Sequence, residues 1–278
     1  MCAVKSLLLL FLIALAGCGG GPGQPEYRGE HYERIISFGP SITQNIYLLE
    51  KQDLLVGVSR YCELLPEVAD REIAGSLIDI NIEQVLKLSP DVVFATTMAR
   101  DEDIRKLRSL GVEVVVFREP ESFEEISSHF MKVGRMLGEE KMAEEILAEI
   151  REKLDGVKDG AVERRPIKVL AQIGANPLWV SPRASFINDI IEFAGGENAG
   201  PERGGRVSME EVLRRDPDVI LVMEMGIGEE QKKMWMNYPA ISAVKNGRIH
   251  IVDSNTFCSP TPEAFLEAVM ITNRILHE

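Results

Sequence analysis

A segment of thirteen residues occurs twice in this chain. Residues 82–94 (IEQVLKLSPDVVF) match residues 209–221 (MEEVLRRDPDVIL) at a constant offset of 127 residues, and six of the thirteen positions are identical. Each copy has a polar cap, a short amphipathic helix, a Pro-Asp turn that stops the helix, and an apolar run typical of a buried strand. Helix–turn–strand units favour similar residues in general, so such a match can also arise without duplication. As a duplication, it predicts two similar lobes.

The rest of the sequence alternates short runs rich in Val and Ile with longer helical patterns. Between two sets of such runs, residues 122–157 have the spacing of a helix, with a break at Gly138. Alternating strands and helices form parallel sheets with helices on their faces. We therefore predict an α/β fold of two Rossmann-like lobes with mainly parallel sheets, bridged by a single long helix. The expected strands are 34–38, 54–58, 91–95, 112–117, 168–173, 218–223 and 248–253.

The bridging helix limits how the lobes can move. Residues 141–155 would form a strut of about 22 Å, and because a helix does not fold like a hinge loop, a large closure would be costly. Ligands of open α/β folds bind where the carboxyl ends of strands converge, so we expect a ligand cleft between the lobes. The predicted domains are an N-terminal lobe at 31–120, a helical linker at 121–160 and a C-terminal lobe at 161–278.

The composition excludes several classes of protein. A chain of 278 residues that is 45% apolar and 27% charged is typical of a folded protein. Its 44 acidic and 31 basic side chains give a net charge of −13, which repels phosphate backbones, so we expect no nucleic-acid partner. Four histidines, no two of them close together, and four cysteines form neither a local zinc motif nor a disulfide-dense scaffold. We predict no metal site.

The N-terminus reads as an export signal. Residues 1–18 (MCAVKSLLLLFLIALAGC) contain one lysine, an apolar run too short for a membrane span of about 20 residues, and then small residues. The last four resemble the lipobox of bacterial lipoproteins, in which Cys18 would be acylated. We predict a signal peptide at 1–17, a flexible tether at 18–30, and an exported protein held at the membrane by lipid alone, in the periplasm or on the outer face of the cell membrane. An ordinary cleaved signal and an uncleaved anchor are the alternatives.

The mature sequence resembles a family of binding proteins. Several segments together carry this resemblance: RIISFGPSITQNIYLL (34–49), VGVSRYCELLP (56–66), INIEQVLKLSPDVVFA (80–95), LRSLGVEVVVF (107–117), SFINDIIEFAGGENA (185–199), VSMEEVLRRDPDVILV (207–222) and VKNGRIHIVD (244–253). They are similar to the class III, helical-backbone substrate-binding proteins of bacterial ABC importers for vitamin B12, haem and ferric siderophores, and most similar to the cobalamin-binding members. The resemblance implies a monomer without a cofactor that delivers a metal chelate to a permease dimer with a cytoplasmic ATPase.

The resemblance also implies which residues meet the permease. In this family an acidic residue on each lobe docks against permease arginines, and Glu83 and Glu210 occupy these positions. Asn81 with Gln84, and Ser208 with Glu211, have capping-box spacing, which would leave Glu83 and Glu210 free. The alternative is that these carboxylates only stabilise their helices, because negative charge in the first turn interacts favourably with the helix dipole.

The ligand-binding side chains are expected on loops that follow strands. The rings are Tyr61, Trp179 and Phe257, and the charges are Arg60, Arg100 and Arg183. Rings suit a corrin or porphyrin face, whereas arginines suit anionic siderophore or propionate oxygens. Core packing is the alternative for each ring.

The sequence departs from the cobalamin binders at two positions. Leu77 and Thr96 stand where those binders place tryptophans. A corrinoid is therefore the first prediction, with a ferric siderophore or haem, for which Tyr61 could be the axial ligand, as the alternative. Cys62 and Cys258 should face the same cleft from different lobes, where a disulfide would obstruct binding; we expect two thiols or a ligand contact.

An enzyme on the same scaffold is the competing class. The sequence has no G-x-S-x-G elbow, no Walker A motif and no H-E-x-x-H, and Gly226-Ile227-Gly228 is not followed by a third glycine. A scattered active site could lack such motifs, which leaves a lipid-anchored α/β enzyme as a remote alternative, and a structural or adhesive lipoprotein as another. Binding without turnover is the prediction.

Overall fold

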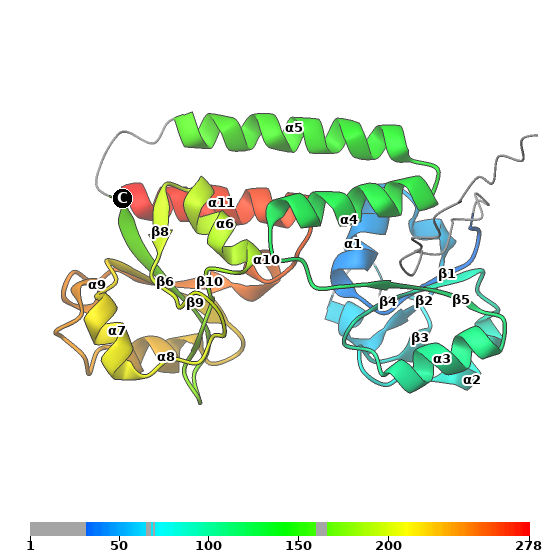
Figure 1. The fold of residues 1–278 in the computed structure, drawn as a ribbon, viewed down its shortest axis with the longest axis horizontal. Helices are drawn as coiled ribbons and strands as arrows, with labels where there is room; N and C mark the ends of the chain where they lie inside the picture. The colour runs from blue at the N-terminus through cyan, green and yellow to red at the C-terminus, as the bar shows by residue number, and fades with distance from the viewer. Residues whose placement is uncertain (1–31, 65–67, 69, 160–165) are drawn as a thin grey trace, which may run out of the picture. The chain divides into compact units, whose positions relative to one another are not determined.

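The computed structural model describes residues 32–64, 68, 70–159 and 166–278. The predicted signal peptide, Cys18 and the tether lie outside these residues. Residues 31–278 group into one compact unit, and within it two sheets are covered by helices (Figure 1).

The N-terminal sheet is parallel throughout and has the strand order β3-β2-β1-β4-β5. One face is covered by α1 and the bridging helices, and the other by α2 and α3. Its elements are β1 (Ile35–Ser37), α1 (Pro40–Leu48), β2 (Leu55–Ser59), β3 (Ile73–Gly75), α2 (Ile82–Leu88), β4 (Val92–Thr96), α3 (Asp101–Ser109) and β5 (Glu113–Phe117), with 3-10 turns at Gln52–Leu54 and Arg60–Leu64.

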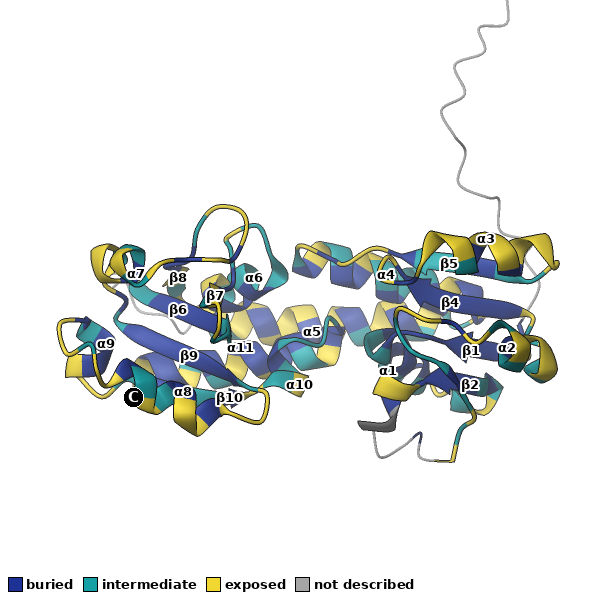
Figure 2. Ribbon diagram, turned by 90° about the horizontal axis from the view of Figure 1, so that it is seen from below, coloured by how far each residue is buried: buried dark blue, intermediate teal, exposed yellow. Residues whose placement is uncertain are grey.

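The C-terminal sheet has the order β10-β9-β6-β7, and β8 pairs with the first part of β6. Its pairs are parallel except for β6 with β7. Its elements are β6 (Ile167–Gly174), β7 (Trp179–Val180), α6 (Phe186–Phe193), β8 (Gly196–Asn198), α7 (Met209–Arg215), β9 (Val219–Glu224), α8 (Gly228–Trp235), α9 (Ser242–Lys245), β10 (Ile249–Asp253), α10 (Ser254–Phe257) and α11 (Pro262–His277). Figure 2 shows β1, β4, β6 and β9 buried, while α3 and α7 turn exposed faces outward.

The predicted fold class is confirmed. Each of the seven expected strands is present, as are the helices between them. The sequence patterns missed β3, β7 and β8, which are only two or three residues long. Runs of that length carry too little periodicity to be recognised.

The bridge contains two helices, separated at the predicted break. They are α4 (Phe123–Met136) and α5 (Glu140–Asp159), separated at Gly138, whose φ of 74° stops the first helix. Each helix contributes to the cores of both lobes: α4 through Phe123 and Phe130, and α5 through Leu154 and Leu147. In Figure 1 both helices run above the sheets, on the side away from α2 and α7. Bending the bridge would disturb both cores, which disfavours a large closure.

The duplicated segment has the same structure in both lobes. Helices α2 and α7 are each seven residues long and begin 127 positions apart. Each is followed by a residue in the left-handed conformation, Ser89 with φ of 47° and Asp216 with φ of 46°. A non-glycine residue in this region is uncommon, so its recurrence at matched positions supports a common helix–turn–strand unit.

The carboxylate of the Pro-Asp turn also has the same role twice. Asp91 accepts a hydrogen bond of 2.9 Å from the backbone N–H of Arg34, and Asp218 accepts one of 2.9 Å from the backbone N–H of Lys168. In both lobes the turn is thereby tied to the start of the neighbouring strand. This explains why Pro-Asp is retained in both copies.

Candidate ligand-binding site

A cavity of about 280 Å³ opens at the carboxyl ends of the N-terminal strands. The end of each of the five strands, or the segment that follows it, supplies part of the wall, because parallel strands end at the same edge of their sheet. The C-terminal lobe completes the wall with the segment that follows β10. The described lining residues are Gly39, Pro40, Ser41, Gln44, Tyr61, Leu77, Thr96, Met98, Glu119, Asn255, Cys258, Ser259 and Pro260.

Gly39 allows α1 to begin immediately after β1. A Cβ atom at this position would lie 2.9 Å from Ile42 Cδ1 and 3.1 Å from Thr96 Cγ2. The glycine therefore keeps the strand-to-helix turn close to β4, and Pro40 then starts the helix. Through this turn, Ser41 and Gln44 reach the cavity wall.

The wall combines apolar surface with neutral hydrogen-bonding groups. Tyr61, Leu77 and Met98 supply apolar atoms, and Tyr61 is 51% exposed. Glu119 is the charged side chain among the described lining residues. It remains open to solvent, yet desolvation by the surrounding protein raises the pKa of its carboxyl. A cationic or hydrogen-bond-donating group of a ligand would be stabilised here.

Two side chains join the lobes at the cavity wall. The hydroxyl of Ser259, in the segment after α10, donates a hydrogen bond of 2.5 Å to the side-chain oxygen of Gln44 in α1. The site is thus built from both lobes, as the cleft prediction requires.

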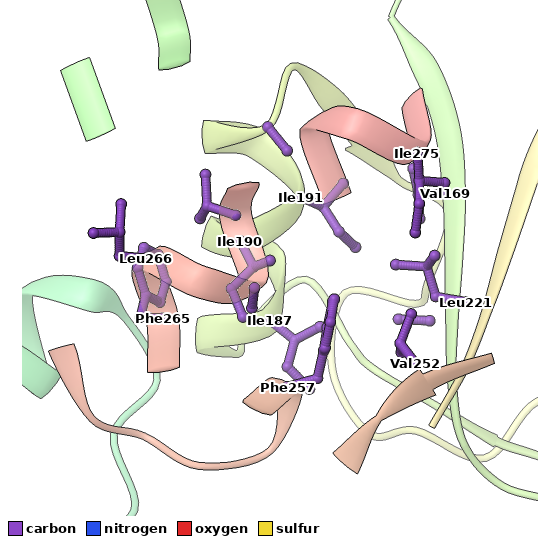
Figure 3. Packing of buried hydrophobic residues seen from close by; sticks show 14 of the residues in the cluster. Val169, Ile187, Ile190, Ile191, Leu221, Val252, Phe257, Phe265, Leu266 and Ile275 are labelled. Carbon is purple, nitrogen blue, oxygen red and sulfur yellow. The ribbon is translucent and has the colours of Figure 1, made fainter. Parts of the chain in front are cut away.

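Phe257 does not contact the cavity, and the prediction of a ligand-facing ring there is wrong. Its side chain is fully buried in the C-terminal core. Figure 3 shows it packed among Ile187, Leu221 and Val252. The one-turn helix α10 directs Phe257 inward, so the next residue, Cys258, faces the cavity instead.

Trp179 is 43% exposed but is not among the described residues of the cavity wall. It lies on β7, where its indole covers Gly205: a Cβ atom at Gly205 would lie 2.1 Å from Trp179 Nε1. The ring is therefore supported by backbone on one side, and its role as a ligand contact stays a prediction.

None of the three arginines is among the described residues of this cavity wall. Arg60 lines a separate open cavity beside β3 and the start of α2. Arg100 forms ion pairs with Asp79 at 2.6 Å and with Asp103 at 3.4 Å. Arg183 donates to the backbone oxygen of Asn198 and pairs with Glu197. The latter two guanidinium groups already have acidic or carbonyl partners, which weakens the expectation that they bind an anionic ligand.

Both cysteines are free, as expected, but they do not share the cleft. Cys62 is fully buried, with its sulfur 3.3 Å from Ser59 Oγ and 3.4 Å from Thr43 Oγ1. The prediction that Cys62 faces the ligand is therefore wrong. Cys258 lines the cavity, and burial raises the pKa of its thiol to about 11.

Glu83 and Glu210 are exposed, and neither has a side-chain hydrogen bond or ion pair with a described residue. Ser208 and Glu211 form the full capping box. In α2 only half of it is present: Asn81 caps the helix, but the Gln84 side chain donates to Glu72. The side chains of Glu83 and Glu210 therefore take no part in helix capping.

Sequence reasoning missed several residues of the wall. Met98, Asn255 and Ser259 lie on loops that follow strands, where the ligand-binding side chains were expected, but these three residues were not singled out. Glu119 lies two residues after β5. Its place directly after a predicted strand was the signal that could have identified it.

Among the described residues, histidine, cysteine and acidic side chains nowhere gather in threes where they could hold a metal ion. No described helix combines the length and apolarity needed to cross a membrane.

Two α/β lobes that share a cavity at their strand ends define a class of protein, a substrate-binding protein with its site between the lobes. Comparison with known proteins agrees: a model of the periplasmic binding protein family matches residues 35–256. The chain belongs to this family. Because its members and solved neighbours are binding proteins, the prediction that it is not an enzyme is confirmed.

Two curated relatives cover most of the chain. The vitamin B12-binding protein of Vibrio cholerae serotype O1 is 26% identical over 242 residues, which are 85% of this chain and 86% of that protein. An uncharacterized ABC transporter substrate-binding lipoprotein of Bacillus subtilis is 25% identical over 281 residues, covering 90% of this chain and 89% of that protein.

Two solved structures share the fold. The periplasmic vitamin B12-binding protein of Vibrio cholerae superposes with a TM-score of 0.75 at 26% identity, covering 88% of this chain and 97% of that one. A possible iron-binding, periplasmic solute-binding protein of Staphylococcus epidermidis superposes with a TM-score of 0.79 at 25% identity, covering 90% of this chain and all of that one.

Proposed function

We propose that this protein captures a corrinoid in the cavity and delivers it to an ABC permease. The observation that carries the proposal is the chemistry of the cavity wall. It offers an aromatic ring and aliphatic side chains beside amide and hydroxyl groups, and arginine is absent from its described residues.

This wall suits a corrinoid better than an anionic chelate. A corrinoid has an apolar ring face and a fringe of neutral amides, which can exchange hydrogen bonds with Gln44, Asn255 and Ser259. Haem propionates and citrate-type siderophores carry negative charge, which the Glu119 carboxylate would repel. The relative named as a vitamin B12-binding protein supports the same ligand class.

Haem or a ferric siderophore is the second candidate. Tyr61 lies on the cavity wall, and a phenolate can be an axial ligand of haem iron. The structural neighbour described as possibly iron-binding supports the siderophore version.

Delivery would use the two lobes together. Lipid on Cys18 would hold the monomer at the membrane, and Glu83 and Glu210 would engage basic residues on a permease dimer driven by a cytoplasmic ATPase. Support comes from the free, exposed carboxylates and from the position of α2 and α7, which both lie on the side of the sheets away from α5 (Figure 1). A relative named as a lipoprotein supports the anchor.

Calorimetric titration tests the ligand. The purified protein is titrated with cyanocobalamin, cobinamide, haemin and ferric citrate under one set of conditions. We expect saturable binding of the two corrinoids and at least about tenfold weaker binding of the anionic chelates, a difference of about 1.4 kcal/mol. Binding of haemin or ferric citrate alone would replace the proposal with the second candidate.

A further inference from the structure

Helices α2 and α7 are exposed at the same positions of the repeat. Position by position, the degree of burial along the seven residues of α2 is identical to that along α7. A buried valine lies at the centre of each helix, Val85 and Val212. The two helices are therefore seated on their sheets in the same way, and their outer faces can be compared directly.

Each outer face carries an exposed leucine three residues after the free glutamate. Leu86 is 41% exposed and Leu213 is 40% exposed. Residues three apart on a helix are neighbours on one face, so each leucine lies beside Glu83 or Glu210. We call each such pair a Glu–Leu patch.

A single exposed leucine needs no explanation, but a matched pair does. Neighbouring positions of the repeat differ: Leu88 corresponds to Arg215, and Ser89 corresponds to Asp216. The exposed apolar residue is nevertheless present in both copies. The part of each leucine that remains in contact with water is apolar surface that a partner could bury.

The two patches are arranged for one partner with two equivalent surfaces. They belong to different lobes, yet both helices lie on the side of the sheets away from α5 (Figure 1). Free carboxylates favour basic groups opposite them, and the leucines favour an apolar pocket. Because the patches are chemically equivalent, the matching partner is a pair of like subunits.

We propose that Leu86 and Leu213 are the apolar anchors of a docking surface for a two-subunit transmembrane partner. Each leucine enters an apolar pocket beside a basic residue that pairs with the adjacent glutamate. The inference rests on the proposed function, since it names further residues of the same docking step. Unlike the proposed function, it assigns much of the affinity for the permease to the burial of apolar surface rather than to charge.

The test measures docking of the full-length protein, with cyanocobalamin added as the ligand, onto the permease–ATPase complex of the same organism, reconstituted in lipid vesicles. Leu86→Gln and Leu213→Gln keep helix propensity while removing the apolar surface. We expect each single variant to dock about 5- to 10-fold more weakly and the double variant about 30-fold or more. Ligand affinity and thermal stability should match those of the parent.

Matched controls separate the causes. Leu110, another leucine of the N-terminal lobe, is 45% exposed, but its counterpart 127 positions later is Asn237 rather than leucine. The Leu110→Gln variant should therefore dock like the parent. Leu86→Met with Leu213→Met should restore docking. At about 0.5 M salt, where charge pairs are screened, the leucine effect should persist while the effect of Glu83→Ala with Glu210→Ala shrinks.

The outcomes distinguish this inference from the proposed function. If the leucine double variant docks like the parent while the glutamate double variant does not dock, Leu86 and Leu213 are not anchors, but the docking function of Glu83 and Glu210 is retained. If both double variants dock like the parent, the docking site itself is wrong. A leucine double variant that also loses ligand binding or stability would contradict the anchor role.

Discussion

Gln44 and Ser259, which are 215 positions apart in the sequence, are joined by a side-chain hydrogen bond of 2.5 Å at the cavity wall. Gln44 belongs to α1 of the N-terminal lobe, and Ser259 follows α10 of the C-terminal lobe. The bond joins the lobes where we propose that the ligand sits.

The first prediction concerns this bond. A double-mutant cycle with Gln44→Ala and Ser259→Ala should give a coupling of about 0.5–1.5 kcal/mol in the free energy of unfolding, the usual net value of one hydrogen bond. Urea unfolding of the four proteins measures it. Strict additivity of the two changes would show that the bond does not form in solution.

The second prediction concerns Glu119. Desolvation raises the pKa of its carboxyl, so the folded protein holds this proton to a higher pH than the unfolded chain does. Stability is then lost as the pH rises above the ordinary value of 4.5, because the unfolded state binds fewer protons. Glu119→Gln lacks this titration, and its stability relative to the parent should increase between about pH 4 and pH 7.

Unfolding of both proteins over this pH range provides the measurement. If the difference between their free energies of unfolding did not change over this pH range, the raised pKa of Glu119 would be contradicted. We also expect Glu119→Gln to bind haemin more tightly than the parent does. Equal or weaker binding by the variant would contradict this expectation.

The third prediction uses Cys258 as a reporter of the cavity. Its pKa of about 11 leaves little thiolate near neutral pH, so alkylation by iodoacetamide should be slow and should accelerate as the pH rises. Bound ligand should slow it further, because the thiol lines the cavity. Cys62, which is fully buried, should react only after unfolding.

Peptide mapping by mass spectrometry identifies the modified residue, and Cys258→Ser is the control. Equal alkylation rates with and without a saturating ligand would place the ligand elsewhere.

Most of the fold could be predicted from the sequence because its strands and helices have strong periodicity. The duplicated unit around Val85 and Val212 was recognisable, and both copies have the expected structure. The site was harder. Phe257 and Cys258 are adjacent, and which of them faces the cavity depends on how the single turn of α10 packs on the core. No local pattern contains that information.

How the bridging helices pack could not be predicted from the sequence. Gly138 predicted a break, but that α4 packs against both cores follows from contacts such as the stacking of Phe123 on Phe265 at 4.5 Å. Similarly, the arginines were singled out by their charge alone. In the structure, two of them form ion pairs with neighbouring acids, Arg100 with Asp79 and Arg183 with Glu197.

The fourth prediction concerns delivery. Glu83→Ala with Glu210→Ala should leave ligand affinity unchanged and abolish ligand-stimulated ATPase activity and uptake, because both exposed carboxylates are lost. Each single change should have a smaller effect. Uptake of labelled cyanocobalamin by cells that carry only the variant is the measurement, and normal uptake by the double variant would overturn the assignment.

The central claim is that the ligand binds in the cavity between the lobes. Asn255→Trp places a large ring on the cavity wall, and Asn237→Trp places the same ring at an exposed position outside it. In calorimetric titration with cyanocobalamin, we expect Asn255→Trp to weaken binding at least about 100-fold, or about 2.8 kcal/mol, and Asn237→Trp to bind like the parent. Parent-like affinity in Asn255→Trp would contradict the account.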